Sequence, residues 1–545
     1  MMSNRRRWAI LALVSLPVFI GALDLTIISA VLPSVVLDLE IPLETSLDDA
    51  AWAVSGYLMA YAITMSFMGR VSDLIGRRKV YLACLVIFIA GSWLVATSTQ
   101  GPTDLLTHLA RAGGARPDRS GVALAALVIG RVIQAIGAGA MVPVTMALVG
   151  DLFPEGRRAQ PLGVVAAVDT GGWVLGHLYG GVMVKWLSDL RAAGALQSPF
   201  FDWQILFLLN IPVGALALVG AWRALRGVPQ PLDAGRFDFV GAALFTLTHL
   251  GVVLGLGANA EASAAGATTL ESLAQPPPYA LPALAAGLAA LALFVVWELR
   301  VRDPLHNLRL FRQRLYASVS ATNLFVGFAL VIGLVSVPIL INVRQVDLTY
   351  IHQAALEAGV LLSALTVPMA LAAIPGGRLT ARFGYRPPVV AGLALAVVGF
   401  ALMGFTWTGY TPYPEMALHL AITGVGLGLT FSPISAAAVN TAPEDERGSV
   451  SALVIIIRLV GMTAGIAGMT TYSLHRLTAI TAASTGSPVF DFDAATAVVF
   501  DATVQVVREV MLTGAAVCLV ALVPALLIGR RKEIEAEAKS VAERP

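Results

Sequence analysis

The chain has 545 residues, of which 57% are hydrophobic and only 13% are charged. Soluble globular proteins carry about 25% charged residues, so this composition excludes a soluble fold and indicates a polytopic membrane protein. The net charge of +2 indicates no nucleic-acid partner, because the basic residues lie in short loops. Cys84 and Cys518 both fall in apolar runs, which predicts neither a disulfide nor a metal site.

Apolar runs of about 20 residues predict fourteen membrane-spanning helices. They lie at 8–33, 49–69, 79–99, 121–150, 159–185, 203–223, 238–258, 279–298, 316–342, 352–374, 388–408, 415–440, 447–472 and 508–529. The first run is too long for a signal peptide and no small-residue cleavage site ends it, so no cleavable leader is expected. An even number of helices places both termini on the same side.

The distribution of Lys and Arg indicates which side that is. With the N-terminus inside, the predicted cytoplasmic segments hold 26 of the 36 basic residues and the outer segments hold 8. Arg131 and Arg458, the remaining two, fall inside helices. Because cytoplasmic loops of membrane proteins carry an excess of Lys and Arg, we expect a multi-pass protein of the cell membrane with both termini in the cytoplasm.

One sequence pattern occurs twice. GRVSDLIGRR begins at Gly69 after the second predicted helix, and GRLTARFGYR begins at Gly377 after the tenth. Two six-helix halves would place the second copy after the eighth helix, so two extra helices lie between the halves. The predicted fold is therefore an all-α membrane protein with 14 transmembrane helices in a 6+2+6 arrangement of two pseudo-symmetric halves, the plan of repeated transporter halves.

This plan divides the chain into five parts. The stretch from Arg300 to Arg314, between the extra helices and the second half, has leucines and a phenylalanine among five arginines, which predicts an amphipathic helix on the membrane surface. The outer loop at 473–507 either holds a short helix or lies over the outer mouth. The five parts are an N-terminal half at 1–226, two extra helices at 227–300, the cytoplasmic linker at 301–315, a C-terminal half at 316–529 and a charged tail at 530–545.

A glycine-rich stretch in the fifth predicted helix combines two unusual features. Gly172, Gly176 and Gly180 are four residues apart and form one bare stripe, which lets another helix approach closely in lipid. The same stretch carries Asp169 and His177, two ionisable groups at membrane depth. Such groups are costly in a bilayer and usually serve a function, so we expect more than an anchor.

Four motifs in the expected helices resemble the major facilitator superfamily, in its fourteen-helix drug:proton antiporter branch. GRVSDLIGRRK at 69–79 resembles the superfamily's loop signature, and LDLTIISAVLP at 23–33 resembles the first-helix motif of the branch. RVIQAIGAG at 131–139 resembles the fourth-helix motif. The fourth motif is the antiporter glycine spacing of Gly163, Gly172, Gly176, Gly180 and Gly181, in which His177 stands where the family has proline.

This resemblance implies a proton-coupled antiporter that exports an amphiphilic, drug-like small molecule by alternating access. Such an antiporter needs no cofactor beyond the proton gradient, is not an enzyme and works as a monomer. The resemblance makes Asp24 the proton-coupling carboxylate and gives Arg131 a role in tuning a nearby carboxylate. A structural alternative remains open for each residue. Asp24 alternatively makes a hydrogen bond that holds the first helix, and Arg131 is alternatively a static polar clamp between helices.

The other site residues also carry two interpretations. Asp169 is either a second protonatable site or a helix–helix hydrogen bond, and His177 either titrates near neutral pH or packs in place of the proline. In the loop signature, Gly69, Asp73, Gly76 and Arg77 form the cytoplasmic gate. Asp73 and Arg77 are four residues apart, a spacing that favours a pair on one helical turn. Asn210, Asn323 and Arg458 are candidate cavity residues or satisfied interior groups.

The substrate stays open at the level of sequence. There is no acid deep in the tenth or thirteenth predicted helix, and the resemblance implies that exporters of multivalent organic cations in this branch carry extra acids there. This absence leaves amphiphiles and lipids as substrates. The alternatives to a drug exporter are a lipid or glycolipid exporter of the cell envelope and, from another class, a transporter-like sensor or scaffold that moves nothing.

Overall fold

The computed structural model describes residues 2–39, 47–114, 118–192, 203–228, 232–255, 279–344, 351–484 and 492–529. Throughout these ranges the regular structure is helical, as the composition predicts. Each of the fourteen predicted spans falls on a helix, and the fourth is divided at Ala140 into two helices. Within the described residues, eleven helical spans are both long and apolar enough to cross a membrane, and a shorter apolar helix lies at Phe239–Gly255.

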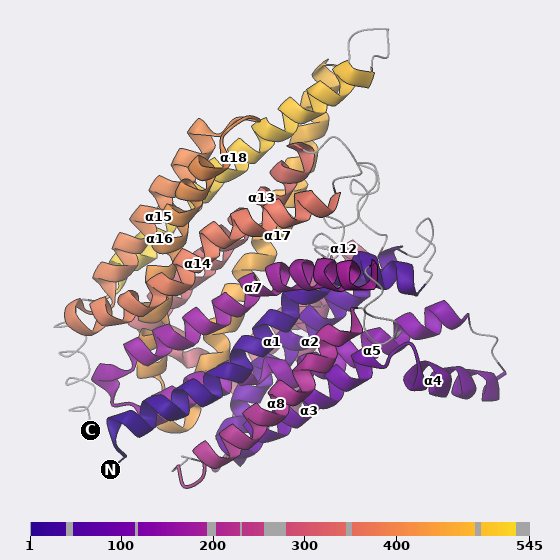
Figure 1. The fold of residues 1–545 in the computed structure, drawn as a ribbon. Coiled ribbons are helices and arrows are strands. Elements are labelled where there is room, and N and C mark those ends of the chain that lie inside the picture. Colours follow the sequence, from indigo (N-terminus) through magenta and orange to yellow (C-terminus); the bar gives the residue numbers. More distant parts are fainter. Residues whose placement is uncertain are drawn as a thin grey trace.

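The first group of helices forms one bundle, coloured indigo to magenta in Figure 1. Its core is lined by large side chains such as Tyr57, Tyr81 and Phe88, which are fully buried. The helices are α1 (Asn4–Asp38), α2 (Leu47–Ile75), α3 (Arg77–Ala96), α4 (Gly101–Ala112), α5 (Arg119–Gly139), α6 (Met141–Leu152), α7 (Ala159–Ala192) and α8 (Gln204–Ala224). The short helix α4 lies between the third and fourth predicted spans, at 79–99 and 121–150.

The last group forms a second bundle with a core of its own, coloured red to yellow in Figure 1. Phe400, Trp407 and Phe431 are buried in that core. The helices are α13 (Arg314–Arg344), α14 (Ile351–Phe383), α15 (Arg386–Thr406), α16 (Tyr413–Thr441), α17 (Arg447–Ser484) and α18 (Phe492–Leu527).

The extra helices α9 (Phe239–Gly255) and α12 (Ala280–Arg300) pack on each other. They approach closely because a side chain on Gly251 or Gly287 would overlap the backbone of the other helix. Phe245 and Phe294 from this pair form a small apolar cluster with Leu305, Ala452 and Ile456. The pair is thus anchored beside α17, and α9 also contacts α2.

Two predicted segments differ from the expectation. The linker at 301–315 is no continuous surface helix, because its regular part is a five-residue 3-10 helix, η2 (Leu308–Arg312). Leu305 and Leu310 from this linker are buried in the protein instead of facing lipid. In the predicted loop at 473–507, α17 extends to Ser484 and α18 begins at Phe492. Residues 485–491 between them lie outside the described ranges, so the prediction of a cover over the outer mouth stays a prediction.

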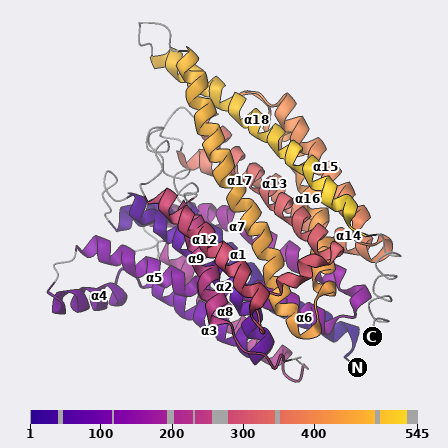
Figure 2. The same cartoon turned by 180° about the vertical axis from the view of Figure 1, so that it is seen from behind.

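The two bundles meet mainly through α2 with α17, α6 with α17, and α7 with α14 and α16. Figures 1 and 2 show that α1 begins and α18 ends at the same end of the molecule. Four helix termini also come together there and exchange hydrogen bonds and ion pairs across the bundles. They are the ends of α2 and α6 and the starts of α7 and α17. This end therefore contains the contacts that join the two halves.

Candidate functional site

Asp24 of α1 lies at the centre of a polar network that is closed off from solvent. One carboxylate oxygen pairs with the Arg131 guanidinium of α5 at 2.6 Å, and the other accepts a hydrogen bond from Asn210 of α8 at 2.9 Å. Asp24 and Arg131 are both 0% exposed. A buried carboxylate is tolerated only with such partners, so three helices converge on this one group.

Arg131 in turn has all sides of its guanidinium occupied. It donates to the Gln134 side chain at 2.7 Å and to the backbone carbonyl oxygens of Asp24 and Ala53 at 3.2 Å and 3.4 Å. Its guanidinium carbon lies 3.9 Å from the centre of the Tyr57 ring, a cation–π contact. The geometry supports both interpretations of Arg131, since the same contacts clamp the helices and hold a cation against Asp24.

The glycine stripe of α7 packs directly behind Asp24. A Cβ at Gly172 would overlap Ala22 and the backbone of α1, and one at Gly176 would overlap Thr26 and the Leu23 carbonyl. The predicted close approach is confirmed, and it fixes the stretch of α1 that carries Asp24. Gly163, at the start of α7, instead meets α14 of the other bundle at Ala373.

The rest of the antiporter motif lies on the same helix. α7 is a single helix from Ala159 to Ala192, so it continues through the motif without a break. Gly180 and Gly181 are part of it, and so is His177, whose side chain lies outside the described part of the structure. The two interpretations of His177 therefore stay predictions.

Asp169 of α7 faces the other bundle. Arg458 of α17 is the charged group that acts electrostatically on it, and Asp169 acts on Arg458 in turn. Among the described residues, Oδ1 of Asp169 is buried without a hydrogen-bond partner. The structure thus offers no helix–helix hydrogen bond at Oδ1, and a buried carboxylate oxygen without a donor is costly unless it takes up a proton or a partner.

The three candidate cavity residues are placed differently from one another. Asn210 belongs to the Asp24 network, because its side chain donates to the Asp24 carboxylate. Asn323 of α13 is buried, where it donates to the Val454 carbonyl at 2.6 Å and accepts from Arg458 at 3.2 Å. Arg458 also lies over the Phe431 ring at 4.1 Å, so Asn323 and Phe431 position the cation that faces Asp169.

A second polar cluster joins the two bundles at the end of α2. The two carboxylate oxygens of Asp73 accept hydrogen bonds from the backbone N–H groups of Gly448 at 3.0 Å and Ser449 at 2.9 Å. These groups are in the first turn of α17, where N–H groups have no partner within the helix and the helix dipole favours a negative charge. Asp73 therefore caps a helix of the opposite half.

Close backbone contact and a turn complete this arrangement. A Cβ on Gly69 would overlap the Gly448 carbonyl, so only glycine lets α2 and α17 approach this closely. Gly76 ends the helix with a φ of +102°, a value that favours glycine. Both predicted gate glycines thus have a physical reason for their position.

Arg77 connects this cap to a wider ionic cluster. It pairs with Asp73 at 2.9 Å, as its spacing predicts, and with Asp151 of α6 at 2.7 Å. Arg447 of α17 also pairs with Asp151, at 3.1 Å. Because Arg77, Asp73 and Asp151 are all nearly excluded from water, their charges depend on one another. The cluster locks the two halves together at this end.

Sequence reasoning missed three members of these clusters. All three lie at helix ends, where charged residues are common at the membrane–water interface and indicate no special role. They are Asp151, Arg447 and Arg158. Arg447 and its partner Asp151 are 296 residues apart in sequence, and Arg158 and its partner Asn440 are 282 residues apart. The local signal is that Asp151 directly follows the predicted helix at 121–150 and that Arg447 is the first residue of the predicted helix at 447–472.

The surface also holds a cavity apart from both networks. It has a volume of about 520 Å³ and lies between α3 and α8, where Arg78, Lys79, Leu82 and Trp222 are among its lining residues. None of these four belongs to the Asp24 network or caps α17, so we assign the cavity no part in the site.

Comparison with known proteins decides the family. The model for the Major Facilitator Superfamily matches residues 14–466 and 324–544. The chain belongs to the major facilitator superfamily. This membership bears out the superfamily part of the resemblance, whereas the relatives do not single out the drug:proton antiporter branch.

Among curated superfamily relatives, the triacylglyceride transporter of Mycobacterium tuberculosis (strain ATCC 25618 / H37Rv) is 31% identical over 555 residues, covering 97% of this chain and 96% of its own. That of Mycolicibacterium smegmatis (strain ATCC 700084 / mc(2)155) is 30% identical over 539 residues, covering 95% and 87%. Both relatives are named for a lipid rather than a drug.

Solved structures agree on the fold. A proton:xylose symporter of the superfamily superimposes with a TM-score of 0.57 at 14% identity, covering 97% of both chains. The human organic anion transporter MFSD10 gives a TM-score of 0.55 at 16% identity, covering 97% of this chain and all of its own. At these identities the likeness concerns the fold alone.

Proposed function

We propose that the chain is a proton-coupled exporter that moves an uncharged lipid across the cell membrane by alternating access. The observation that carries the lipid is the similarity to triacylglyceride transporters over 95–97% of the chain at 30–31% identity. This favours the lipid exporter over the drug exporter that the sequence motifs suggest, and it supports an apolar lipid of the cell envelope as the proposed substrate.

The charges at membrane depth support an uncharged substrate. Asp24 pairs with Arg131 inside one bundle, and Asp169 faces Arg458 across the two bundles. A cationic drug would need a buried acid whose charge is left free for it, because an unpaired charge is costly in lipid. A triacylglyceride brings no charge, so a pathway whose own charges compensate one another suits it.

Proton coupling is proposed for two carboxylates with different surroundings. Both carboxylate oxygens of Asp24 have partners, one in Arg131 and the other in Asn210. In contrast, Oδ1 of Asp169 has no hydrogen-bond donor among the described residues. When the halves rock, these surroundings change, and a carboxylate whose surroundings change with the cycle takes up and releases a proton.

In this proposal the Asp73 cluster is the cytoplasmic gate. With Asp73 bound to the first turn of α17 the two halves are held together at this end. Opening toward the cytoplasm requires these contacts to break. The placement of this end in the cytoplasm rests on the excess of Lys and Arg in the loops there.

The test is lipid transfer by the purified full chain in proteoliposomes. We expect labelled triacylglyceride to be translocated faster than in protein-free vesicles, whereas a cationic dye of similar hydrophobicity is not. Equal translocation rates for the dye and the lipid would favour the drug exporter over the lipid exporter. Binding of the lipid without any translocation, with or without a gradient, would favour the sensor or scaffold.

A further inference from the structure

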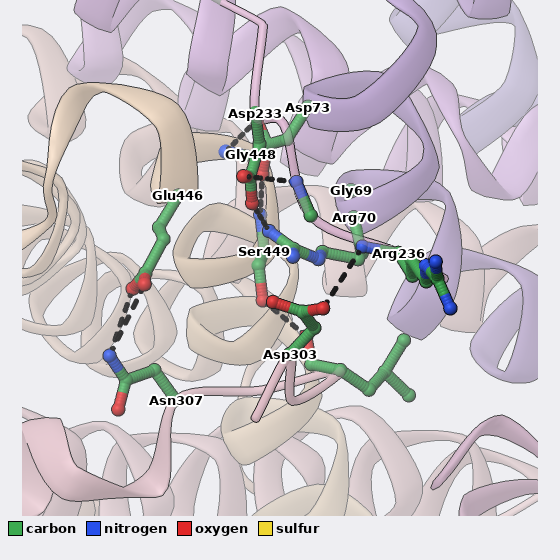
Figure 3. A network of polar contacts seen from close by, with 12 residues as sticks. Gly69, Arg70, Asp73, Asp233, Arg236, Asp303, Asn307, Glu446, Gly448 and Ser449 are labelled. Atoms are coloured by element: carbon green, nitrogen blue, oxygen red, sulfur yellow. Dashed lines mark hydrogen bonds and ion pairs between the residues drawn. The ribbon is translucent and has the colours of Figure 1, made fainter. Parts of the chain in front are cut away.

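The linkers that flank the extra helices each hold one helix of the gate. In the α8–α9 linker, the backbone N–H of Asp233 donates to the Asp73 carbonyl at 3.0 Å, and the Asp233 carboxylate pairs with Arg70. Figure 3 shows Asp233 between Arg70 and Asp73. This linker is thus fixed to the end of α2.

The α12–α13 linker holds the other gate helix. The hydroxyl of Ser449 donates to the Leu305 carbonyl at 2.7 Å, and Asn307 donates to the Glu446 carboxylate at 3.1 Å and 3.3 Å. Both contacts are made to the start of α17 or to the turn before it. Figure 3 shows Asn307 and Glu446 together, on the side of Ser449 away from Arg70.

The two linkers are bonded to each other and to the extra helices. The backbone N–H of Arg236 donates to the Asp303 carboxylate at 3.3 Å, which joins linker to linker. The backbone N–H of His306 donates to Glu298 of α12 at 3.1 Å. A continuous set of contacts therefore runs from α2 through both linkers to α17, with α9 and α12 as its support.

His306 is the side chain that fastens this set to Ser449. Its Nδ1 lies 3.1 Å from the Ser449 hydroxyl, whose proton already goes to Leu305, so Nδ1 must carry the donated hydrogen. Burial lowers the pKa of His306 to about 3, which keeps the ring neutral. The ring also packs edge-on against Phe245 and Phe294 of the extra helices.

Ser449 is therefore bound twice, by different atoms and to different parts. Its backbone N–H binds Asp73 of the gate, and its hydroxyl binds the α12–α13 linker. We propose that α9, α12 and the two linkers form a clasp that stabilises the closed gate, with Ser449 and His306 as its positioning residues. The role of the clasp in transport rests on the proposed function, whereas the contacts that close the gate are observed in the structure.

The Ser449→Ala variant tests the clasp, because it removes the hydroxyl and leaves the backbone N–H on Asp73. Ser451→Ala is the matched control, since Ser451 is buried in the same helix and its hydroxyl has no hydrogen-bond partner in the described structure. Spin labels at Arg157→Cys and Asp445→Cys, exposed positions on opposite halves, report the gate separation. The native Cys84 and Cys518 are buried and stay unlabelled.

With the full chain in nanodiscs and no lipid substrate added, we expect Ser449→Ala to raise the ratio of open to closed gate roughly fivefold, the effect of losing about one hydrogen bond. Ser451→Ala should leave the distance distribution unchanged. An unchanged distribution in Ser449→Ala, or equal shifts in both variants, would overturn the clasp. The readout requires no transport, so failure of the lipid assay would not affect it.

A double-variant cycle separates positioning from a general loss of packing. His306→Phe keeps the ring contacts with Phe245 and Phe294 but loses the Nδ1 donor. If the two residues act as one unit, the double variant with Ser449→Ala opens the gate no more than Ser449→Ala alone. Fully additive shifts would mean that the two residues act independently and would contradict the clasp.

Discussion

The two copies of the repeated loop pattern perform equivalent packing with different chemistry. Gly69 of the first copy meets the start of α17, and Gly377 of the second meets the start of α7 at Ala159. Both copies then end their helix at a glycine with positive φ, Gly76 at +102° and Gly384 at +86°. The backbone arrangement is thus repeated between the halves.

The side chains are not repeated. The first copy has buried ion pairs among Asp73, Arg77, Asp151 and Arg447. At the second copy, Arg158 bonds the neutral side chain of Asn440 at 2.9 Å, and Asn440 donates to the Tyr385 hydroxyl at 2.8 Å. Ala381, at the position of Asp73, is exposed.

This difference indicates which contact controls opening. Buried ion pairs are strongly coupled, since removing one member leaves another charge without a partner. Single hydrogen bonds contribute less, about 1 kcal/mol between neutral groups and about 1.5–3 kcal/mol where one group is charged, and losing one leaves no buried charge without a counterion. We therefore expect the first copy to set the closed state of the gate and the second copy to act mainly through packing.

The largest effect is expected for Arg77→Gln. It leaves the buried carboxylate of Asp73 without its cation and weakens the pairing of Asp151, at a cost of about 3–5 kcal/mol to the closed gate. Tyr385→Phe, at the matching position of the second copy, loses one hydrogen bond and should cost about 1 kcal/mol. Label distances between 157 and 445 measure both, and equal effects would remove the asymmetry.

Asp73→Asn should have the next largest effect. An amide accepts one of the two N–H groups of α17 but offers its own donor to the other, which costs about 1.5–3 kcal/mol for the lost charged hydrogen bond. We expect slower lipid transfer with lipid binding largely retained, measured by flux and by binding on the same preparation. Lost binding with a normal transfer cycle would contradict the assignment of Asp73 to the gate.

Ala381→Asp sharpens the same comparison and should have the smallest effect. It gives the second copy the acid that the first copy has, yet position 381 is exposed and does not reach α7. A surface charge changes stability by about 0.5 kcal/mol or less, so flux and label distances should match the wild type. A marked tightening of the gate would mean that side-chain identity alone makes the difference between the copies.

Local features of this fold could be predicted from the sequence. Apolar length located the fourteen helices because each must span about 30 Å of hydrocarbon. The four-residue spacing predicted the Asp73–Arg77 pair, and the glycine stripe predicted the approach of α7 to α1. In each case the signal lies within one turn or one helix.

Contacts set by tertiary packing could not be predicted. Asn210 is 186 residues from Asp24, and nothing in its neighbours indicates that α8 would face α1. Leucines among arginines in the linker indicated an amphipathic segment, but the pattern is the same whether the apolar side meets lipid or protein. The extension of α17 and α18 is stabilised by Arg476 and Glu509, which pair at 2.9 Å between helices and not within one.

The central claim is that Asp24 couples lipid export to the proton gradient. Asp24→Asn removes the titrating group but also leaves Arg131 without its buried counterion, a change that costs about 3–5 kcal/mol when uncompensated. The structure therefore requires the second variant Asp24→Asn with Arg131→Gln, which removes the unpaired cation. Folding of each is checked by gel filtration and thermal unfolding before transport is measured.

The decisive measurement is flux of labelled triacylglyceride in proteoliposomes with and without an imposed pH gradient. We expect wild-type flux to rise with the gradient, and both Asp24 variants to fold, retain a slow downhill flux and lose its response to the gradient. Asp169→Asn, measured beside them, reports whether the second carboxylate also carries a proton. Full gradient-driven flux in a folded Asp24→Asn variant would contradict the account and transfer the coupling role to Asp169.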